Sequence, residues 1–104
     1  MTTEAAFAIQ VEHLLDLFGW TWIHHEPAIR QSGTWATPMR GMRGFPDYCA
    51  VRRGRVIFAE IKATNGRLTK HQKDWIELLQ ATETEVYVWY PENLPQVRRI
   101  LQHD

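Results

Sequence analysis

The stretch GFPDYCAVRRGRVIFAEIK, residues 44–62, decides the fold because it holds two short apolar runs on either side of a tight turn. The runs at residues 46–51 and 55–62 are rich in β-branched and aromatic residues, and the Arg-Gly pair between them is typical of a hairpin turn. A buried strand is usually apolar throughout, yet the second run contains Glu60 and Lys62. Side chains alternate between the two faces of a strand, so these two point to the same side.

The hairpin brings a second acid to the same place. Asp47 lies at the start of the first run, and in a tight hairpin the start of one strand lies beside the end of its partner. We therefore expect Asp47, Glu60 and Lys62 to converge. Two carboxylates in contact repel each other, which raises the pKa of one of them, and a divalent cation removes this conflict.

These three side chains form a candidate metal site. Hard oxygen ligands favour Mg²⁺ or Mn²⁺, and such an ion activates a bound water and holds a scissile phosphate. Lys62 then orients the water or stabilises charge on the phosphate. The alternative is a strand-end ion pair between Glu60 and Lys62, with Asp47 as a turn former.

The length and composition of the chain predict one domain over residues 1–104. The sequence is 44% hydrophobic, which is enough for a core, and 23% charged, which is ordinary for a soluble protein. No apolar run approaches the ~18 residues of a membrane span, and the N-terminus has no signal-peptide pattern. The single cysteine, Cys49, excludes an internal disulfide and a cysteine-based zinc cluster. A reducing, cytoplasmic setting fits these features best.

The formal net charge is zero, but the charges are segregated along the chain. Residues 27–73 contain ten basic residues and two acids, a net charge of +8, and the flanking residues sum to −8. A polyanion such as nucleic acid is the natural partner of this middle segment. A solvated basic surface is the alternative.

Periodicity predicts an α/β protein, a small mixed sheet flanked by helices. The expected order is α-β-β-β-α-β-α, over residues 3–18, 20–25, 46–51, 55–62, 69–81, 85–90 and 94–101. The strand at residues 85–90 is apolar enough to be central, and the path from residue 55 to residue 90 predicts a parallel crossover. Thr69 and Gln72 form a capping box at the start of the second helix. The long irregular segment at residues 26–44 is typical of a functional or mobile loop.

Three motifs together resemble the VRR-NUC family of the PD-(D/E)XK nuclease superfamily. They are GFPD at residues 44–47, EIK at residues 60–62 and GRLT at residues 66–69, the last followed by Gln72 and Trp75. The resemblance covers most of the chain and implies a Mg²⁺- or Mn²⁺-dependent endonuclease on a restriction-endonuclease-like core. The single-domain phage and bacterial members resemble Holliday-junction resolvases. The resemblance therefore implies branched DNA as substrate and a homodimer, in the cytoplasm of a bacterial host or a phage-infected cell.

The resemblance also implies roles for individual residues. Asp47 and Glu60 look like the metal ligands, the backbone carbonyl of Ile61 like a further ligand, Lys62 like the catalytic lysine and Gln72 like the glutamine near the site.

An acid on the first helix is a further feature of the superfamily, and Glu4 and Glu12 compete for this role. Glu4 lies one helical turn from Phe7 on the apolar stripe, whereas Glu12 lies about 100° away from that stripe. We favour Glu4 and keep Glu12 as the alternative, and a solvated helix acid remains the alternative for each.

Basic side chains outside the metal site are the expected phosphate contacts. Arg40 and Arg43 alternate with glycines, which lets that backbone approach a sugar-phosphate strand closely. The other candidates are Arg52, Arg53, Arg55 and Arg67, which we expect in loops, and Lys70 and Lys73. The resemblance implies that His24 approaches the DNA backbone, with a partly exposed structural histidine as the alternative. Trp35 is expected either to stack on an exposed base or to pack across a dimer interface.

The leading hypothesis is a structure-specific DNA endonuclease that hydrolyses phosphodiester bonds with the help of a metal ion. The first alternative is a catalytically inactive nucleic-acid-binding module on the same fold. The second is a protein that binds no nucleic acid and in which Glu60 and Lys62 are a structural pair.

Overall fold

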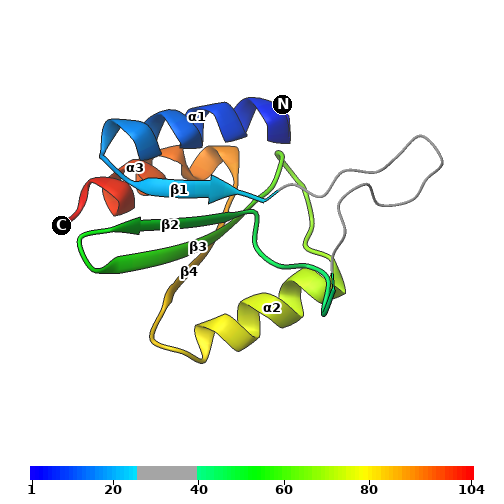
Figure 1. Cartoon of the computed structure of the whole chain (residues 1–104). Helices are drawn as coiled ribbons and strands as arrows, with labels where there is room; N and C mark the ends of the chain where they lie inside the picture. Colours follow the sequence, from blue (N-terminus) through cyan, green and yellow to red (C-terminus); the bar gives the residue numbers. More distant parts are fainter. Residues whose placement is uncertain (26–39) are drawn as a thin grey trace.

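The computed structural model describes residues 1–25 and 40–104, and its elements follow the predicted order (Figure 1). They are α1 (Glu4–Leu17), β1 (Thr21–His24), β2 (Tyr48–Arg52), β3 (Arg55–Ile61), α2 (Lys70–Gln80), β4 (Glu85–Trp89), the 3-10 turn η1 (Pro91–Asn93) and α3 (Leu94–Gln102). The predictions for Trp35 and for its loop concern residues 26–39, which lie outside the described part of the chain. Within the described part, no helix has the length and apolar character needed to cross a membrane.

The four described strands form one sheet in the order β1-β2-β3-β4. The first three are antiparallel neighbours, and β4 returns parallel to β3 after the crossover through α2. Among the described strands β4 is therefore at an edge, and the prediction that it is central was wrong. Its apolar sequence instead reflects cover on both faces: α2 packs on one side, and Trp89 lies in the core with Val97 and Leu101 of α3 on the other.

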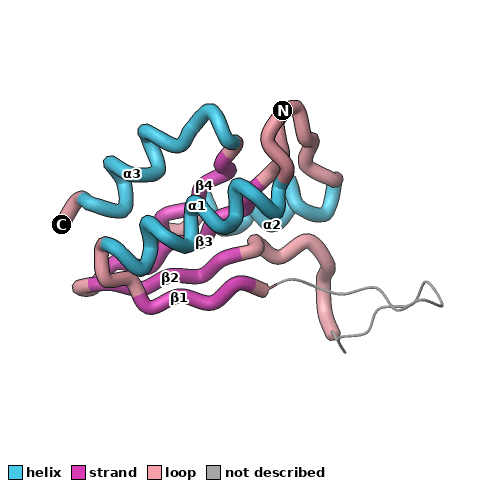
Figure 2. The backbone as a smooth tube through the Cα atoms, turned by 90° about the horizontal axis from the view of Figure 1, so that it is seen from above, coloured by secondary structure: helices cyan, strands magenta, loops and turns pink. Residues whose placement is uncertain are grey.

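Two helices cover one face of the sheet and one helix covers the other. Figures 1 and 2 show α1 and α3 side by side on one face, with α2 on the opposite face. Phe7, Val11 and Leu15 of α1 are almost fully buried against β3 residues such as Ile57 and Ile61. Side chains alternate between the two faces of β3, so Phe58 and Glu60 lie on the opposite face, the one that is turned toward α2.

Candidate active site

Asp47 and Glu60 meet where β2 begins and β3 ends, as the hairpin predicted. The residue after Asp47, Tyr48, pairs with Ala59, so continuation of this antiparallel register puts Asp47 opposite Glu60. Asp47 directly precedes β2 and does not begin it. Its Oδ2 accepts a hydrogen bond from the Ile61 amide at 3.0 Å, and its carbonyl accepts one from the His25 amide at 2.6 Å. The first bond fixes the Asp47 carboxylate at the end of β3, and the second fixes its main chain beside the end of β1.

Glu60 is a buried acid with an unsatisfied oxygen. Its exposed fraction is 1%, and its Oε1 has no hydrogen-bond partner among the described residues. Burial raises the pKa of Glu60 to about 9, with the hydrogen bond and the charge of Asp47 as the next causes. The positive charge of Lys62 lowers this pKa, and the negative charge of Glu4 raises it. In the absence of a cation, Glu60 is therefore protonated at neutral pH and donates to Asp47.

The donors at this position fit a divalent cation. A cation would satisfy the unpartnered Glu60 oxygen and remove the repulsion between two carboxylates that share a site. The described residues contain no cluster of three or more His, Cys, Asp or Glu side chains that could hold a metal. The described residues thus offer two carboxylates here, and the other coordination positions of a bound Mg²⁺ would fall to a backbone carbonyl and to water.

Lys62 follows β3 and continues its pairing with β4, because the Lys62 amide donates to the Trp89 carbonyl at 2.9 Å. Its charge reaches Glu60 and lowers the pKa of that acid. No salt bridge joins Lys62 to Glu60 in the described ranges. This arrangement argues against the alternative in which the two residues form a strand-end ion pair.

The two candidate acids of the first helix have different surroundings. Glu12 Oε2 accepts a hydrogen bond from the Tyr48 hydroxyl at 2.5 Å and lies 3.1 Å from His24 Nδ1. The His24 ring also stacks on Tyr48, with 4.2 Å between ring centroids. Glu4 lies in the first turn of α1 and contributes to the raised pKa of Glu60. Glu12 therefore holds His24 and Tyr48, and the choice of Glu4 as the first-helix metal ligand stays a prediction.

Gln72 sits at the start of α2 in the predicted capping box, which the structure confirms. Its Oε1 accepts from the Thr69 amide at 2.9 Å, and its own amide donates to Thr69 Oγ1 at 3.2 Å. The side chain thus fixes the beginning of α2, and its amide N–H groups and the second lone pair of Oε1 remain for other partners. A catalytic role for Gln72 stays a prediction.

The loop that leads into Asp47 is seated on α2. Gly44 has φ +90°, and a Cβ at this position would lie 2.5 Å from the backbone carbon of His71, so only glycine fits. Trp75 Nε1 donates to the Met42 carbonyl at 3.1 Å, and the Phe45 ring packs edge-on against Trp75 and Phe58. The first residues of the GFPD motif therefore dock the loop and set the direction from which Asp47 enters.

Two arginines expected in loops are structural residues of the sheet. Arg52 ends β2 and Arg55 begins β3. The Arg52 side chain is only 9% exposed and donates to the Phe18 carbonyl at 2.8 Å and to the His103 carbonyl at 2.5 Å. Arg55 forms two hydrogen bonds with Glu85, at 2.7 and 2.8 Å. The Arg52 guanidinium thus holds the C-terminal end of the chain, and a DNA contact of Arg52 stays a prediction.

The other predicted DNA contacts fall into two groups, one at the turn of the hairpin and one near the candidate site. Arg53 is exposed, but it pairs with Asp104 at 2.8 Å at the turn end of the hairpin, remote from Asp47. The basic residues that lie around the site are exposed and come from the loop before Asp47, the segment after Lys62 and the first turn of α2: Arg40, Arg43, Arg67, Lys70 and Lys73. Lys70 also pairs with Asp74 at 2.9 Å. Arg53 therefore lies apart from the basic residues whose segments adjoin Asp47 and Lys62.

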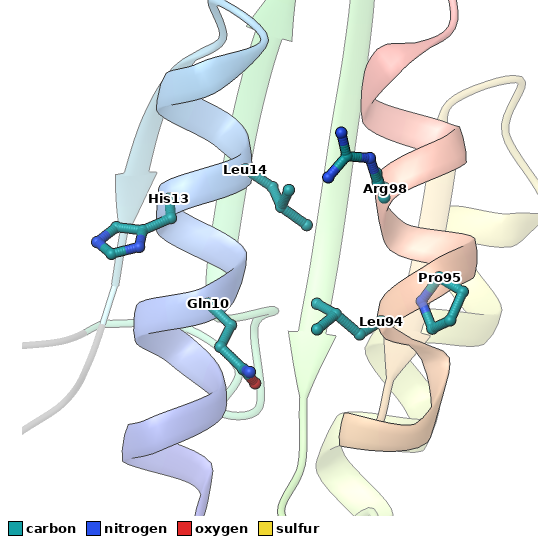
Figure 3. A pocket seen from close by; sticks show the side chains of 6 residues that line it. All are labelled: Gln10, His13, Leu14, Leu94, Pro95 and Arg98. Carbon is teal, nitrogen blue, oxygen red and sulfur yellow. The ribbon is translucent and has the colours of Figure 1, made fainter.

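A groove of about 450 Å³ lies away from this site, between α1 and α3. Figure 3 shows Leu14, Leu94 and Arg98 directed toward the space between the two helices. None of its lining residues belongs to the predicted metal site. The strongest chemical arrangement in the described chain therefore remains the pair of acids at the sheet end.

A mixed sheet with helices on both faces and two acids converging at strand ends defines a small α/β domain with a candidate metal site. The comparison with family models makes this class specific, because residues 29–92 match the VRR-NUC domain. The match covers more than half of the chain, so the chain belongs to the VRR-NUC family, and the resemblance seen in its motifs is confirmed. The searches of curated proteins and of solved structures found no match.

Proposed function

We propose that this protein is a Mg²⁺- or Mn²⁺-dependent endonuclease that hydrolyses phosphodiester bonds in branched DNA such as four-way junctions. The observation that carries the proposal is Glu60, a buried carboxyl with an unpartnered oxygen beside the carboxylate of Asp47. Membership of the VRR-NUC family supports a DNA nuclease. The cytoplasm of a bacterial host or a phage-infected cell is the setting that we propose for it.

The residues of the site have separate tasks in this proposal. A bound Mg²⁺ or Mn²⁺ supplies an activated water and polarises the scissile phosphate. Asp47 and Glu60 would hold the ion, with the Ile61 carbonyl as a further donor. Glu60 would release its proton to solvent on ion binding, because the positive charge of the ion would offset the cost of burying a carboxylate. Lys62 brings an ammonium group that orients the water or stabilises charge on the phosphate.

The exposed cations around the site are the proposed contacts to the DNA backbone. Arg40, Arg43, Arg67, Lys70 and Lys73 are exposed on segments that border Asp47 and Lys62. Contacts of this kind hold DNA regardless of sequence, and their strength falls as salt rises. His24 is the remaining candidate, since Glu12 engages its Nδ1 and leaves its Nε2 for a phosphate.

A homodimer completes the proposed activity on junctions. One site cuts one strand, so paired cuts across a four-way junction need two sites. A two-fold dimer supplies two identical sites in a fixed relation.

A catalytically inactive DNA-binding module on the same fold is the second candidate. It is favoured by the finding that two acids, and not a cluster of three metal-ligating side chains, converge in the described residues. Binding of DNA without cleavage in either metal would support this candidate.

The test is an incubation of the purified protein with four-way junctions, flaps, nicked duplex, linear duplex and single strands, each with EDTA, Mg²⁺ or Mn²⁺. We expect cleavage only with metal, and faster on the branched substrates than on linear duplex. Metal-independent cleavage, or no cleavage of any substrate, would contradict the proposal.

A further inference from the structure

Four of the exposed basic residues near the candidate site come from two segments that are far apart in the sequence. Arg40 and Arg43 belong to the loop at residues 40–46, which we call the docked loop, and Lys70 and Lys73 belong to the start of α2. The chain between them runs through the whole β2–β3 hairpin, so it does not fix their relative position. Contacts between the docked loop and α2 therefore decide whether the four cations form one surface.

Trp75 of α2 contacts the docked loop between its two arginines. The Trp75 Nε1 donates to the Met42 carbonyl at 3.1 Å, and Met42 directly precedes Arg43 and lies two residues after Arg40. Figure 1 shows the docked loop beside the start of α2, from where the chain turns back into β2. The indole N–H therefore acts on the backbone that carries both arginines.

The other end of the docked loop is held by contacts that do not need this N–H. Gly44 lies against the His71 backbone, where a Cβ would come within 2.5 Å. The Phe45 ring packs edge-on against the Trp75 ring, with 5.1 Å between the ring centroids. Beyond the docked loop, the Asp47 carboxylate and carbonyl each accept a backbone N–H. Loss of the indole N–H alone should therefore leave the candidate metal site in place.

Acidic side chains lie beside the docked loop as well. A groove of about 420 Å³ is lined by Met42 and Leu78 together with the acids Asp74 and Glu77. These carboxylates are alternative partners for an arginine whose backbone is no longer held by Trp75. Because an arginine that pairs with a carboxylate is less available to a phosphate, release of the docked loop should weaken DNA binding.

We propose that Trp75 is a positioning residue for DNA binding, whose indole N–H holds the arginines of the docked loop beside the lysines of α2 so that they form one surface for phosphates. This inference rests on the proposed function, since it takes DNA as the ligand of these cations. It adds a residue that is neither a proposed metal ligand nor a proposed DNA contact.

The test measures binding of a fluorescently labelled four-way junction in EDTA by fluorescence anisotropy. Trp75→Phe removes the indole N–H and keeps an aromatic ring, and we expect it to weaken binding by about fivefold, which corresponds to one lost hydrogen bond. The slope of log affinity against log salt should also become shallower, because fewer phosphates are neutralised. Trp22→Phe is the matched control, since the Trp22 indole is also half-buried and donates to Asp16 Oδ1 at 2.8 Å. This control should bind the junction as the parent does.

Two backgrounds show whether Trp75 acts through the docked loop. In the double variant Arg40→Ala, Arg43→Ala, the change Trp75→Phe should cause no further loss of affinity, because the groups that it positions are gone. In Lys73→Ala it should still cause the full loss, because the arginines of the docked loop remain. A merely structural effect of Trp75 would be equal in the two backgrounds.

Gly44→Ala disturbs the same contact from the side of the docked loop. The added Cβ collides with the His71 backbone and moves the docked loop away from α2, so this variant should weaken junction binding at least as much as Trp75→Phe does. Circular dichroism shows whether both variants are folded. Calorimetric titration with Mn²⁺ separates metal binding from DNA binding, and Trp75→Phe should bind Mn²⁺ as Trp22→Phe does.

The possible results separate this inference from the proposed function. If the parent binds the junction while Trp75→Phe and Gly44→Ala bind as Trp22→Phe does, the positioning role is wrong, and cleavage with Mg²⁺ or Mn²⁺ still decides the proposed function. An equal loss in both backgrounds, or no junction binding by the parent, would also overturn the inference. If the parent and its variants bind as expected but the parent cuts no DNA, the proposed function is wrong and the positioning role stands.

Discussion

Charged side chains lie at both ends of the β2–β3 hairpin, but their hydrogen-bond partners differ between the two ends. At the turn end, Arg52 donates to the carbonyls of Phe18 and His103, and Arg55 pairs through two hydrogen bonds with Glu85. Of the buried side-chain nitrogen and oxygen atoms at this end, within the described residues, only the Arg52 Nε lacks a hydrogen-bond partner. At the open end, Glu60 is 1% exposed, its Oε1 is unpartnered, and its nearest acid neighbour is another carboxylate.

This contrast distinguishes charged residues that stabilise the fold from charged residues that take part in binding or catalysis. A cation that donates to carbonyls at the ends of α1 and α3, as Arg52 does, stabilises those helix ends. Its role in the fold is sufficient to explain its presence. A buried acid whose neighbour has the same sign destabilises the fold, and it persists where a ligand of opposite sign uses it. We therefore expect the turn end to affect stability and the open end to affect chemistry.

The largest expected effect is a loss of DNA cleavage in variants at the open end of the hairpin. Asp47→Ala, Glu60→Ala and Lys62→Ala should each reduce cleavage of a four-way junction by about 10³-fold or more, because each removes a ligand or a charge that acts on the transition state. The measurement is a single-turnover cleavage rate in Mg²⁺, with circular dichroism to show that the variants are folded. Arg53→Ala is the control, since it removes an exposed cation at the turn end. Cleavage at the parental rate by the three site variants would show that this assignment is wrong.

The next largest expected effect is a loss of stability in variants at the turn end of the hairpin. Arg52→Met keeps the apolar part of the side chain but removes its donors to main-chain carbonyls, and it should lower the free energy of unfolding by about 2–3 kcal/mol. Urea unfolding measures this loss. Arg53→Met is the matched control, because its side chain is 71% exposed and its pair with Asp104 is solvated, so it should change stability by less than about 1 kcal/mol.

The DNA cleavage rate of Arg52→Met provides a second test of the difference between the two ends. Measured below its unfolding transition, this variant should cut DNA at the parental rate per folded molecule. A large loss of rate with unchanged stability would mean that the turn end takes part in the reaction, and the division between the two ends would fail.

The sequence predicts the open end better than the turn end. Asp47 and Glu60 are brought together by one hairpin, whose register follows from a short turn and an alternating pattern. The partners of Arg52 and Arg55 come from residues 30 to 51 positions away in the chain, and no local pattern reports such contacts.

Two further features depend on tertiary contacts in the same way. The choice between Glu4 and Glu12 turns on the contacts that Tyr48 and His24 make with Glu12, which helical periodicity does not describe. The edge position of β4 was missed because an apolar strand reports cover on its two faces and says nothing about its hydrogen-bonded neighbours.

The smallest expected effect is on the stability of the metal-free protein, and it follows from the raised pKa of Glu60. The folded protein holds this pKa at about 9, against an ordinary value of 4.5. Below pH 4.5 the acid is protonated in both states, so it does not affect the balance. As the pH rises from 4.5 toward 9, the unfolded chain ionises first and becomes favoured, and stability is lost.

Glu60→Gln removes this pH dependence because an amide does not ionise. At pH 8 in EDTA the variant should be more stable than the parent, because ionisation of residue 60 favours the unfolded state of the parent and not that of the variant. Glu92→Gln, a change at an exposed acid of η1, is the control. Unfolding curves measured from pH 5 to pH 9 should diverge for the parent and Glu60→Gln and remain parallel for the parent and Glu92→Gln. If the first pair also stays parallel, Glu60 ionises as readily in the folded protein as in the unfolded chain, and the contrast between an unsatisfied buried acid at one end and hydrogen-bonded cations at the other disappears.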